Sequence, residues 1–151
     1  MIGKIIHTLK YDVAEDILGS IETIVDRFVS AYTQYIPSVD MILPVPLHKK
    51  RFAERGFNQA FLIARILATH TDIPLFSRIL IRKRDTPHQA QLDREGRLKN
   101  VVDAFSISAP EAIRGKRILL VDDVYTTGAT MQTCAEVILS AGASSVSGWT
   151  L

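Results

Sequence analysis

The first 37 residues carry apolar side chains at a helical spacing. The apolar positions step by three or four residues, at Val13, Ile17, Ile21, Ile24, Phe28, Tyr32 and Tyr35. This spacing predicts a long amphipathic helix whose aromatic positions lie in the core. Pro37 ends the helix because proline cannot continue it. We therefore divide the chain into an N-terminal helical segment, residues 1–37, and a core, residues 38–151.

From residue 41 onward, apolar runs suited to strands alternate with helical patterns. Strands are predicted over residues 41–45, 75–81, 104–107, 117–122 and 145–151, and helices over residues 57–68 and 130–140. Pro44 and Pro46 place a rigid loop at the end of the first strand, and Gly142 is suited to end the last helix. This alternation predicts an α/β fold, with a mainly parallel twisted sheet covered by helices on both faces and preceded by the N-terminal helix.

Composition and charge exclude several classes of protein. The 151 residues are 47% apolar and 23% charged, which is typical of a globular domain. The net charge of +2 is too small to indicate nucleic-acid binding by itself. The single cysteine, Cys134, excludes an intrachain disulfide framework, and its place in a predicted helix favours a buried apolar role over a nucleophilic one. With no membrane-length apolar run and no signal peptide, the chain is expected to be cytoplasmic.

The most informative stretch is residues 118–130, Ile-Leu-Leu-Val-Asp-Asp-Val-Tyr-Thr-Thr-Gly-Ala-Thr. Four apolar residues predict a buried strand, and Asp122 and Asp123 follow at the sheet edge where α/β folds bind ligands. A Thr/Gly loop then enters a helix, whose first N–H groups bind phosphate well. Gly128 lets the backbone approach such a ligand closely. Because carboxylates accept hydrogen bonds from sugar hydroxyls, this segment predicts a site for a phosphorylated sugar.

This thirteen-residue segment resembles the motif that binds phosphoribosyl pyrophosphate (PRPP) in type I phosphoribosyltransferases, and it matches the motif throughout. The resemblance implies that Asp122 and Asp123 are the catalytic residues and bind the ribose hydroxyls. It also implies that the following loop binds the 5-phosphate, through Tyr125, Thr126, Thr127, Gly128, Ala129 and Thr130. Mg²⁺ is implied as a cofactor that binds through the substrate, and no protein metal site is predicted.

Two other interpretations of this segment carry less weight. A response-regulator receiver domain also opens on a Val-Asp-Asp sequence after a basic pair. It needs a phospho-acceptor aspartate much further along the chain, and only 28 residues follow Asp123. A generic turn between a strand and a helix, with two acidic residues and no ligand, is the remaining structural alternative.

Further segments narrow the resemblance to one family. Residues 43–51, Leu-Pro-Val-Pro-Leu-His-Lys-Lys-Arg, and residues 54–60, Glu-Arg-Gly-Phe-Asn-Gln-Ala, resemble a signature of the ComF family. Residues 6–11 and 84–92 resemble the flanking blocks of that family, so the resemblance covers nearly the whole chain. Members of this family usually carry an N-terminal Cys-rich zinc module. This chain starts after the position of that module, and zinc binding is therefore not predicted.

The basic segment after the first strand is predicted to be the pyrophosphate loop, because type I phosphoribosyltransferases place theirs at this point. Its candidate residues are Pro46, His48, Lys49, Lys50 and Arg51. The alternatives are a solvated helix start and contact of these cations with a nucleic-acid backbone. Residues 82–99 are rich in charge and resemble in position the flexible loop that closes over PRPP, with Arg84, His88 and Gln89 as ligand contacts. An ordinary surface loop is the alternative there.

Two functions are compatible with these residues. In the first, the chain binds PRPP or a related phosphoribosyl compound with Mg²⁺ and transfers the phosphoribosyl group to an acceptor that the sequence does not identify. In the second, it is a non-catalytic protein that binds a nucleotide or single-stranded DNA and acts with competence proteins in DNA uptake, as the ComF resemblance implies. Release of pyrophosphate would distinguish the two.

Overall fold

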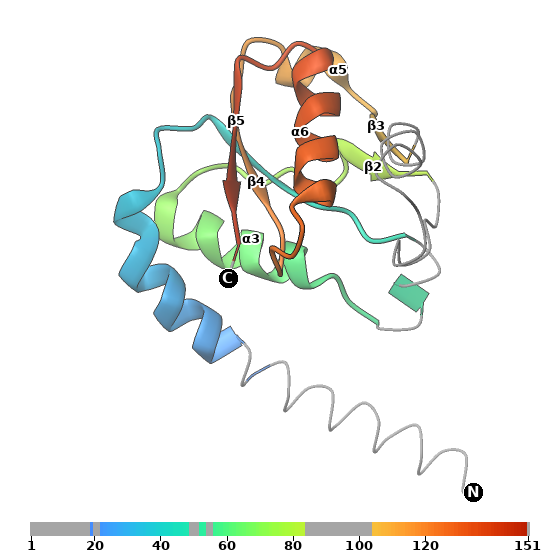
Figure 1. Cartoon of the computed structure of the whole chain (residues 1–151). Coiled ribbons are helices and arrows are strands. Elements are labelled where there is room, and N and C mark those ends of the chain that lie inside the picture. Colours follow the sequence, from blue (N-terminus) through green and yellow to red (C-terminus); the bar gives the residue numbers. More distant parts are fainter. Residues whose placement is uncertain (1–18, 20–21, 49–51, 54–55, 84–103, 151) are drawn as a thin grey trace, which may run out of the picture.

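The computed structural model describes residues 19, 22–48, 52–53, 56–83 and 104–150, and it has the predicted α/β class (Figure 1). Residues 22–32 are helical and continue into a short 3-10 turn, η1 (Thr33–Tyr35). The remaining elements, in chain order, are β1 (Met41–Pro44), α3 (Gln59–Thr71), β2 (Leu80–Arg82), β3 (Phe105–Ile107), α5 (Pro110–Ile113), β4 (Arg117–Val121), α6 (Ala129–Ser140) and β5 (Ser145–Trp149).

The main sheet is parallel, with the strand order β1-β4-β5. On the far side of β1, Leu75 adds a single parallel bridge to Ile42. β2 and β3 form a separate antiparallel pair. The predicted strand over residues 75–81 is therefore two pieces, because the chain bends at residues 77–79 between the bridge and β2.

Pro44 lies inside β1 rather than after it. The N–H groups of a strand alternate in direction: Ile42 donates to the carbonyl of Pro74 at 2.9 Å, and Val45 donates to the carbonyl of Val121 on β4 at 2.8 Å. Position 44 therefore directs its nitrogen away from β4, where a missing N–H breaks no bond of the main sheet. Pairing with β4 thus continues through Val45, one residue beyond the proline.

Two apolar cores lie on opposite faces of the sheet. One contains α6, and its buried residues include Leu43, Leu120 and Ile138. The other contains α3 and the helix at 22–32, with Ile42, Leu67 and Leu119. Alternate residues of β1 and β4 thus enter alternate cores, as the two-residue period of a strand requires. The predicted coverage of both sheet faces by helices is confirmed (Figure 1).

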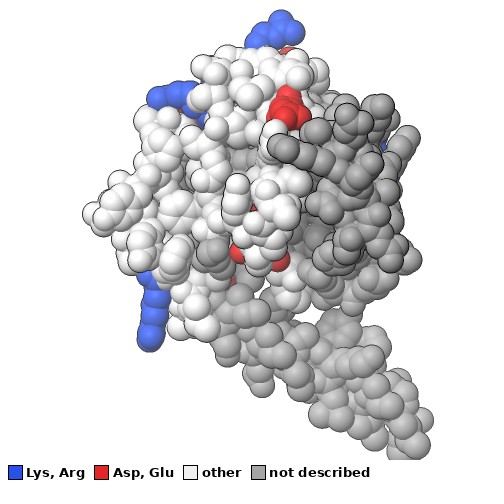
Figure 2. Space-filling view, in the orientation of Figure 1, with Lys and Arg blue, Asp and Glu red and all other residues white. Residues whose placement is uncertain are grey.

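Charged side chains are scattered over one face of the molecule. Figure 2 shows Lys and Arg side chains at separate points of that face, with no continuous basic patch among its described residues. This agrees with the small net charge of +2. Among the helices that the structure describes, none is both long and apolar enough to cross a membrane.

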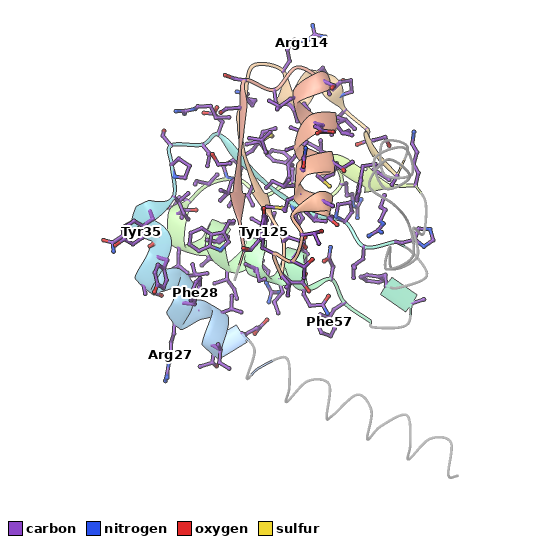
Figure 3. All side chains as sticks on the ribbon, viewed as in Figure 1. Arg27, Phe28, Tyr35, Phe57, Arg114 and Tyr125 are labelled. Carbon is purple, nitrogen blue, oxygen red and sulfur yellow. The ribbon has the colours of Figure 1, made fainter. Side chains whose placement is uncertain are left out.

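The N-terminal helix buries a different stripe from the predicted one. Val25 and Val29 are its buried residues, whereas Tyr32 and Tyr35 are 45% and 70% exposed. The aromatic rings instead stack along the flank: the Phe28 and Tyr32 centroids are 4.5 Å apart, and Phe28 meets Trp149 edge-on at 6.2 Å (Figure 3). Small β-branched side chains let the helix approach the sheet more closely than large rings would. The prediction that Tyr32 and Tyr35 lie in the core is therefore wrong.

Candidate functional site at the carboxyl ends of β1 and β4

The site lies where the chain changes direction across the sheet. From β1 the chain passes through α3 to the Leu75 bridge on one side, and later returns to β4 on the other side. Doubly wound sheets bind ligands at such a switch point, outside the carboxyl ends of the two strands. Here the last hydrogen bond between β1 and β4 joins the N–H of Val45 to the carbonyl of Val121, and the two loops begin directly after it. The topology thus places both predicted loops at the edge of the sheet where such folds form a ligand-binding crevice.

Main-chain contacts fix Asp122 at this edge of the sheet. Its N–H donates to the carbonyl of Trp149 on β5 at 3.0 Å, which extends the sheet pairing by one residue. Its carboxylate accepts a hydrogen bond from the N–H of Asp123, also at 3.0 Å. Both acidic side chains are half-buried. The pair is therefore held by main-chain contacts and partly shielded from solvent.

Opposing influences act on the pKa of the Asp122 carboxyl group. Burial raises the pKa of Asp122 to about 6, and the neighbouring Asp123 carboxylate acts in the same direction. The hydrogen bond from the Asp123 N–H and the positive charge of Arg82 lower the same pKa. Arg82 lies on β2 with its guanidinium carbon 5.4 Å from the centre of the Phe105 ring. Sequence reasoning did not assign Arg82 to this site because its closeness to Asp122 depends on packing between distant segments.

This raised pKa predicts a pH-dependent gain in stability when Asp122 is replaced by Asn. The folded carboxyl keeps its proton up to about pH 6, whereas the unfolded one loses it near its ordinary value of 3.8. The native state therefore binds more protons between these values, and the stability contributed by this group falls as pH rises through that window. Asp122→Asn should raise the melting temperature more at pH 7.5 than at pH 4.5.

Thermal melts at the two pH values test this expectation. Glu111→Gln is the matched control, because Glu111 is an exposed carboxylate away from the crevice, and it should change the melting temperature equally at both pH values. An Asn variant that gains nothing at pH 7.5, or gains equally at both, would contradict the expectation.

The loop after Asp123 leads into the N-terminus of α6. Gly128 is the residue that precedes the helix, and its φ of +75° is a conformation that favours glycine. The first N–H groups of α6 have no acceptor within the helix, and the N–H of Ala129 donates to the hydroxyl of Thr127 at 3.5 Å. The Tyr125 ring covers Gly128, since a Cβ built there would lie 2.7 Å from the ring carbon Cζ. The predicted phosphate loop therefore has N–H groups without an acceptor inside the helix, and a glycine at which an added Cβ would displace the exposed Tyr125 ring.

Asn58 joins the loop after β1 to α3. Its side-chain amide donates to the carbonyl of Val45 at 3.1 Å, and its side-chain oxygen accepts from the N–H of Ala60 at 3.1 Å. One side chain thus caps the helix and holds the end of β1. Pro46 and His48, two predicted pyrophosphate-loop residues, follow Val45 within three residues of chain.

Replacing Asn58 by Ala should destabilise the domain by about 1–2 kcal/mol, the usual cost of losing a helix cap. Gln59→Ala is the control, because Gln59 follows directly in the chain and its side chain makes no hydrogen bond within the described residues. Denaturant unfolding measures both changes. A midpoint for Asn58→Ala equal to that of the wild type would show that the cap does not stabilise this loop.

The structure tests some of the remaining residue predictions and not others. Lys49, Lys50, Arg51, Arg84, His88 and Gln89 lie outside the described residues, so these assignments stay predictions. Cys134 is fully buried, and burial raises the pKa of its thiol, as does the negative charge of Asp122. The thiol is therefore neutral, which agrees with the predicted apolar role.

Comparison with known proteins identifies the family. A family model described as "Phosphoribosyl transferase domain" matches residues 57–151. The chain belongs to this family. Its curated relatives include "DNA utilization protein YhgH" of Salmonella typhi, which is 31% identical over 99% of this chain and 66% of that protein. "Competence protein ComFC" of Bacillus subtilis is 37% identical over 82% of this chain and 49% of that protein.

"Competence protein F" of Haemophilus influenzae is 33% identical over 79% of this chain. These relatives confirm the predicted resemblance to the ComF family. The chain spans about two thirds of the length of the YhgH relatives and about half that of the ComFC relative.

Solved structures with a similar fold include phosphoribosyltransferases. Glutamine PRPP amidotransferase from B. subtilis, complexed with ADP and GMP, superposes with a TM-score of 0.59 at 21% identity, over 86% of this chain and 26% of that one. Adenine phosphoribosyltransferase from Leishmania tarentolae superposes with a TM-score of 0.53 at 19% identity, over 86% of this chain and 56% of that one. The predicted type I phosphoribosyltransferase fold is thereby confirmed.

Proposed function

We propose that this phosphoribosyltransferase-fold chain binds PRPP, or a closely related phosphoribosyl compound, together with Mg²⁺ and transfers the phosphoribosyl group. The observation that supports this most directly is the arrangement at the switch point of the sheet. There the half-buried Asp122–Asp123 pair is followed by the start of α6, whose first N–H groups have no acceptor within the helix. A sugar with hydroxyls at one end and a phosphate at the other matches both features.

In the proposed complex, the acidic pair binds the ribose ring. Each carboxylate accepts a hydrogen bond from a ribose hydroxyl, which orients the anomeric carbon toward the attacking group. Positive charge develops on the ring as pyrophosphate leaves, and the nearby negative charge stabilises it. Ionised Asp122 is the active form in this role. Its raised pKa therefore predicts that ribose binding weakens as pH falls below about 6.

The loop from Tyr125 to Thr130 is proposed to bind the 5-phosphate. The N–H groups at the start of α6, together with the hydroxyls of Thr126, Thr127 and Thr130, supply donors, and the helix dipole favours an anion there. The segment after β1, including Pro46 and His48, is proposed to bind the pyrophosphate. The two loops would hold the ends of the substrate on opposite sides of the crevice.

Mg²⁺ is proposed to bind through the substrate, while the acidic pair holds the ribose hydroxyls. Within the described residues no group of three or more His, Cys, Asp or Glu side chains could hold a metal ion. Mg²⁺ commonly binds to substrate phosphates in such complexes. When bound, it would neutralise charge on the leaving pyrophosphate.

A second candidate function is supported by the names of the relatives, "DNA utilization protein" and "Competence protein". In this function the domain binds a nucleotide or single-stranded DNA without turnover and acts in DNA uptake with other competence proteins. The basic residues Lys49, Lys50 and Arg51 would then contact the nucleic-acid backbone. Such binding weakens steeply as salt increases, because it releases counterions.

One assay separates the two functions. The protein is incubated with PRPP, Mg²⁺ and a panel of nucleobases and amines, and released pyrophosphate is measured. Acceptor-dependent release supports transfer. Mg²⁺-dependent PRPP binding by calorimetry without release, together with salt-sensitive binding of a single-stranded oligonucleotide, supports the second function. Absence of any PRPP binding would contradict the first proposal.

A further inference from the structure

A cavity distinct from the acidic crevice opens beside the carboxyl end of β1. Its volume is about 690 Å³, within the range of roughly 300–1,000 Å³ that is usual for small-molecule sites. The walls come from the loop after β1, the segment before α3, the first turns of α3 and residues 77–78. Neither the acidic pair nor the loop after it contributes to the walls. The cavity therefore lies outside the proposed ribose and 5-phosphate sites.

Aromatic rings form part of this wall. The cavity is lined by Phe52, Phe57 and Phe61, and Figure 3 labels Phe57 on the segment that leads into α3. Phe52 is 51% exposed and Phe61 is 37% exposed. A ligand that covers this exposed apolar surface is favoured, because burial removes the surface from water. Rings that line a concave surface favour a flat apolar ligand, because it can stack against them.

The charges around the cavity favour an anion. Arg65 lines the cavity but is paired with Glu22, another lining residue. Arg78 also lines it, and its guanidinium makes no hydrogen bond or ion pair within the described part of the chain. Among the described lining residues, Arg78 is therefore a positive charge without an ionic partner, and it lines the same cavity as the aromatic rings. A guanidinium binds carboxylate and phosphate groups through paired N–H donors.

We propose that this cavity binds a small aromatic anion, consisting of one or two flat rings with a single anionic substituent. The rings stack among the phenylalanine side chains, and the anionic group pairs with Arg78. Both halves of the ligand are needed: an uncharged ring leaves Arg78 without a partner, and an anion without rings leaves the aromatic wall in water.

The cavity also shares structure with the proposed pyrophosphate loop. Pro46 and Leu47 line it, and Asn58 ties the start of that loop to α3. A ligand in the cavity would therefore change the affinity for PRPP, and PRPP would change the affinity for that ligand by the same factor. This coupling, unlike the cavity assignment itself, rests on the proposed function.

The test uses naphthalene-2-carboxylate as the probe and naphthalene-2-carboxamide as its neutral counterpart, both titrated into the whole protein and followed by NMR. The carboxylate should shift the amide signals of residues 57–62 and 77–78 saturably, with at least tenfold tighter binding than the carboxamide. Phe61→Ala and Arg78→Gln should each weaken carboxylate binding about tenfold. Phe76→Ala and Arg114→Gln, an exposed Phe and an exposed Arg outside the cavity, should leave it unchanged.

Several results would overturn the assignment. The first is the absence of NMR shifts at the cavity residues. The second is equal affinity for the carboxylate and the carboxamide, and the third is an equal effect of the cavity variants and their controls on carboxylate affinity. Sedimentation that shows a dimer dissociated by Phe61→Ala would also overturn it, because a second copy would then fill the cavity. If the protein binds the probe but not PRPP, the cavity assignment is supported and the proposed function is contradicted. Binding of both without mutual effect refutes the coupling alone.

Discussion

Replacing Asp122 and Asp123 together by Asn should weaken PRPP binding from about tenfold to several hundredfold while the domain stays folded. Each carboxylate is proposed to accept a hydrogen bond from a ribose hydroxyl, and hydrogen bonds to charged groups contribute about 1.5–3 kcal/mol each. Asparagine keeps the shape and can still accept a bond through its amide oxygen, so the loss falls toward the lower end of that range.

Stability should not suffer in this double variant. The amide oxygen introduced at position 122 can still accept the N–H of residue 123, and the substitution removes the cost of burying a charge at position 122. Calorimetric titration with PRPP and Mg²⁺ measures the affinity, and a thermal melt verifies folding. Glu111→Gln serves as the control for loss of an exposed carboxylate. Unchanged affinity in a folded double variant would mean that the acidic pair does not bind ribose.

The segment from β4 to α6 could be predicted from the sequence because its determinants are local. Four consecutive apolar residues form the buried strand, the two acidic residues follow it directly, and α6 begins one residue before the predicted start. Gly142 ends α6 as predicted: it has a φ of +101°, and the N–H of Ala143 bonds to the carbonyl of Ile138. Each of these features depends on neighbours within a few residues of chain.

Features that depend on tertiary packing could not be predicted in the same way. The N-terminal helix has two adjacent apolar stripes, and only contact with the sheet selects Val25 and Val29 over the tyrosines. The charge of Arg82 reaches Asp122 because β2 pairs with β3 beside α6, a contact that no local pattern indicates. The helix α5 spans only Pro110–Ile113, which is too short to show a helical period.

The same distinction applies within the candidate site. Gly128 was assigned to the phosphate loop from its place in the motif, but its contact with Tyr125 is a property of the folded loop. Two constraints therefore act on this glycine: a backbone conformation that costs other residues about 1–2 kcal/mol, and a ring packed where a Cβ would lie. A substitution at this position tests both.

Gly128→Ala should weaken PRPP binding at least tenfold and destabilise the domain more than Gly115→Ala does. Gly115 is a matched control, because its φ of +70° imposes the same backbone strain while no atom lies within 4 Å of its added Cβ. At position 128 the methyl group must also displace the Tyr125 ring. The strained turn then shifts the N–H groups at the start of α6, which need to converge on the phosphate.

A double variant separates the two constraints. Adding Tyr125→Ala to Gly128→Ala removes the ring, so the stability loss should fall to the level of Gly115→Ala, which reflects backbone strain alone. PRPP affinity should stay low in the double variant, since the backbone of the loop is still strained. Denaturant unfolding and calorimetry measure the two quantities. If Gly128→Ala proves no more costly to stability than Gly115→Ala, the ring contact is not a constraint. If it also binds PRPP like the wild type, the start of α6 does not bind the phosphate.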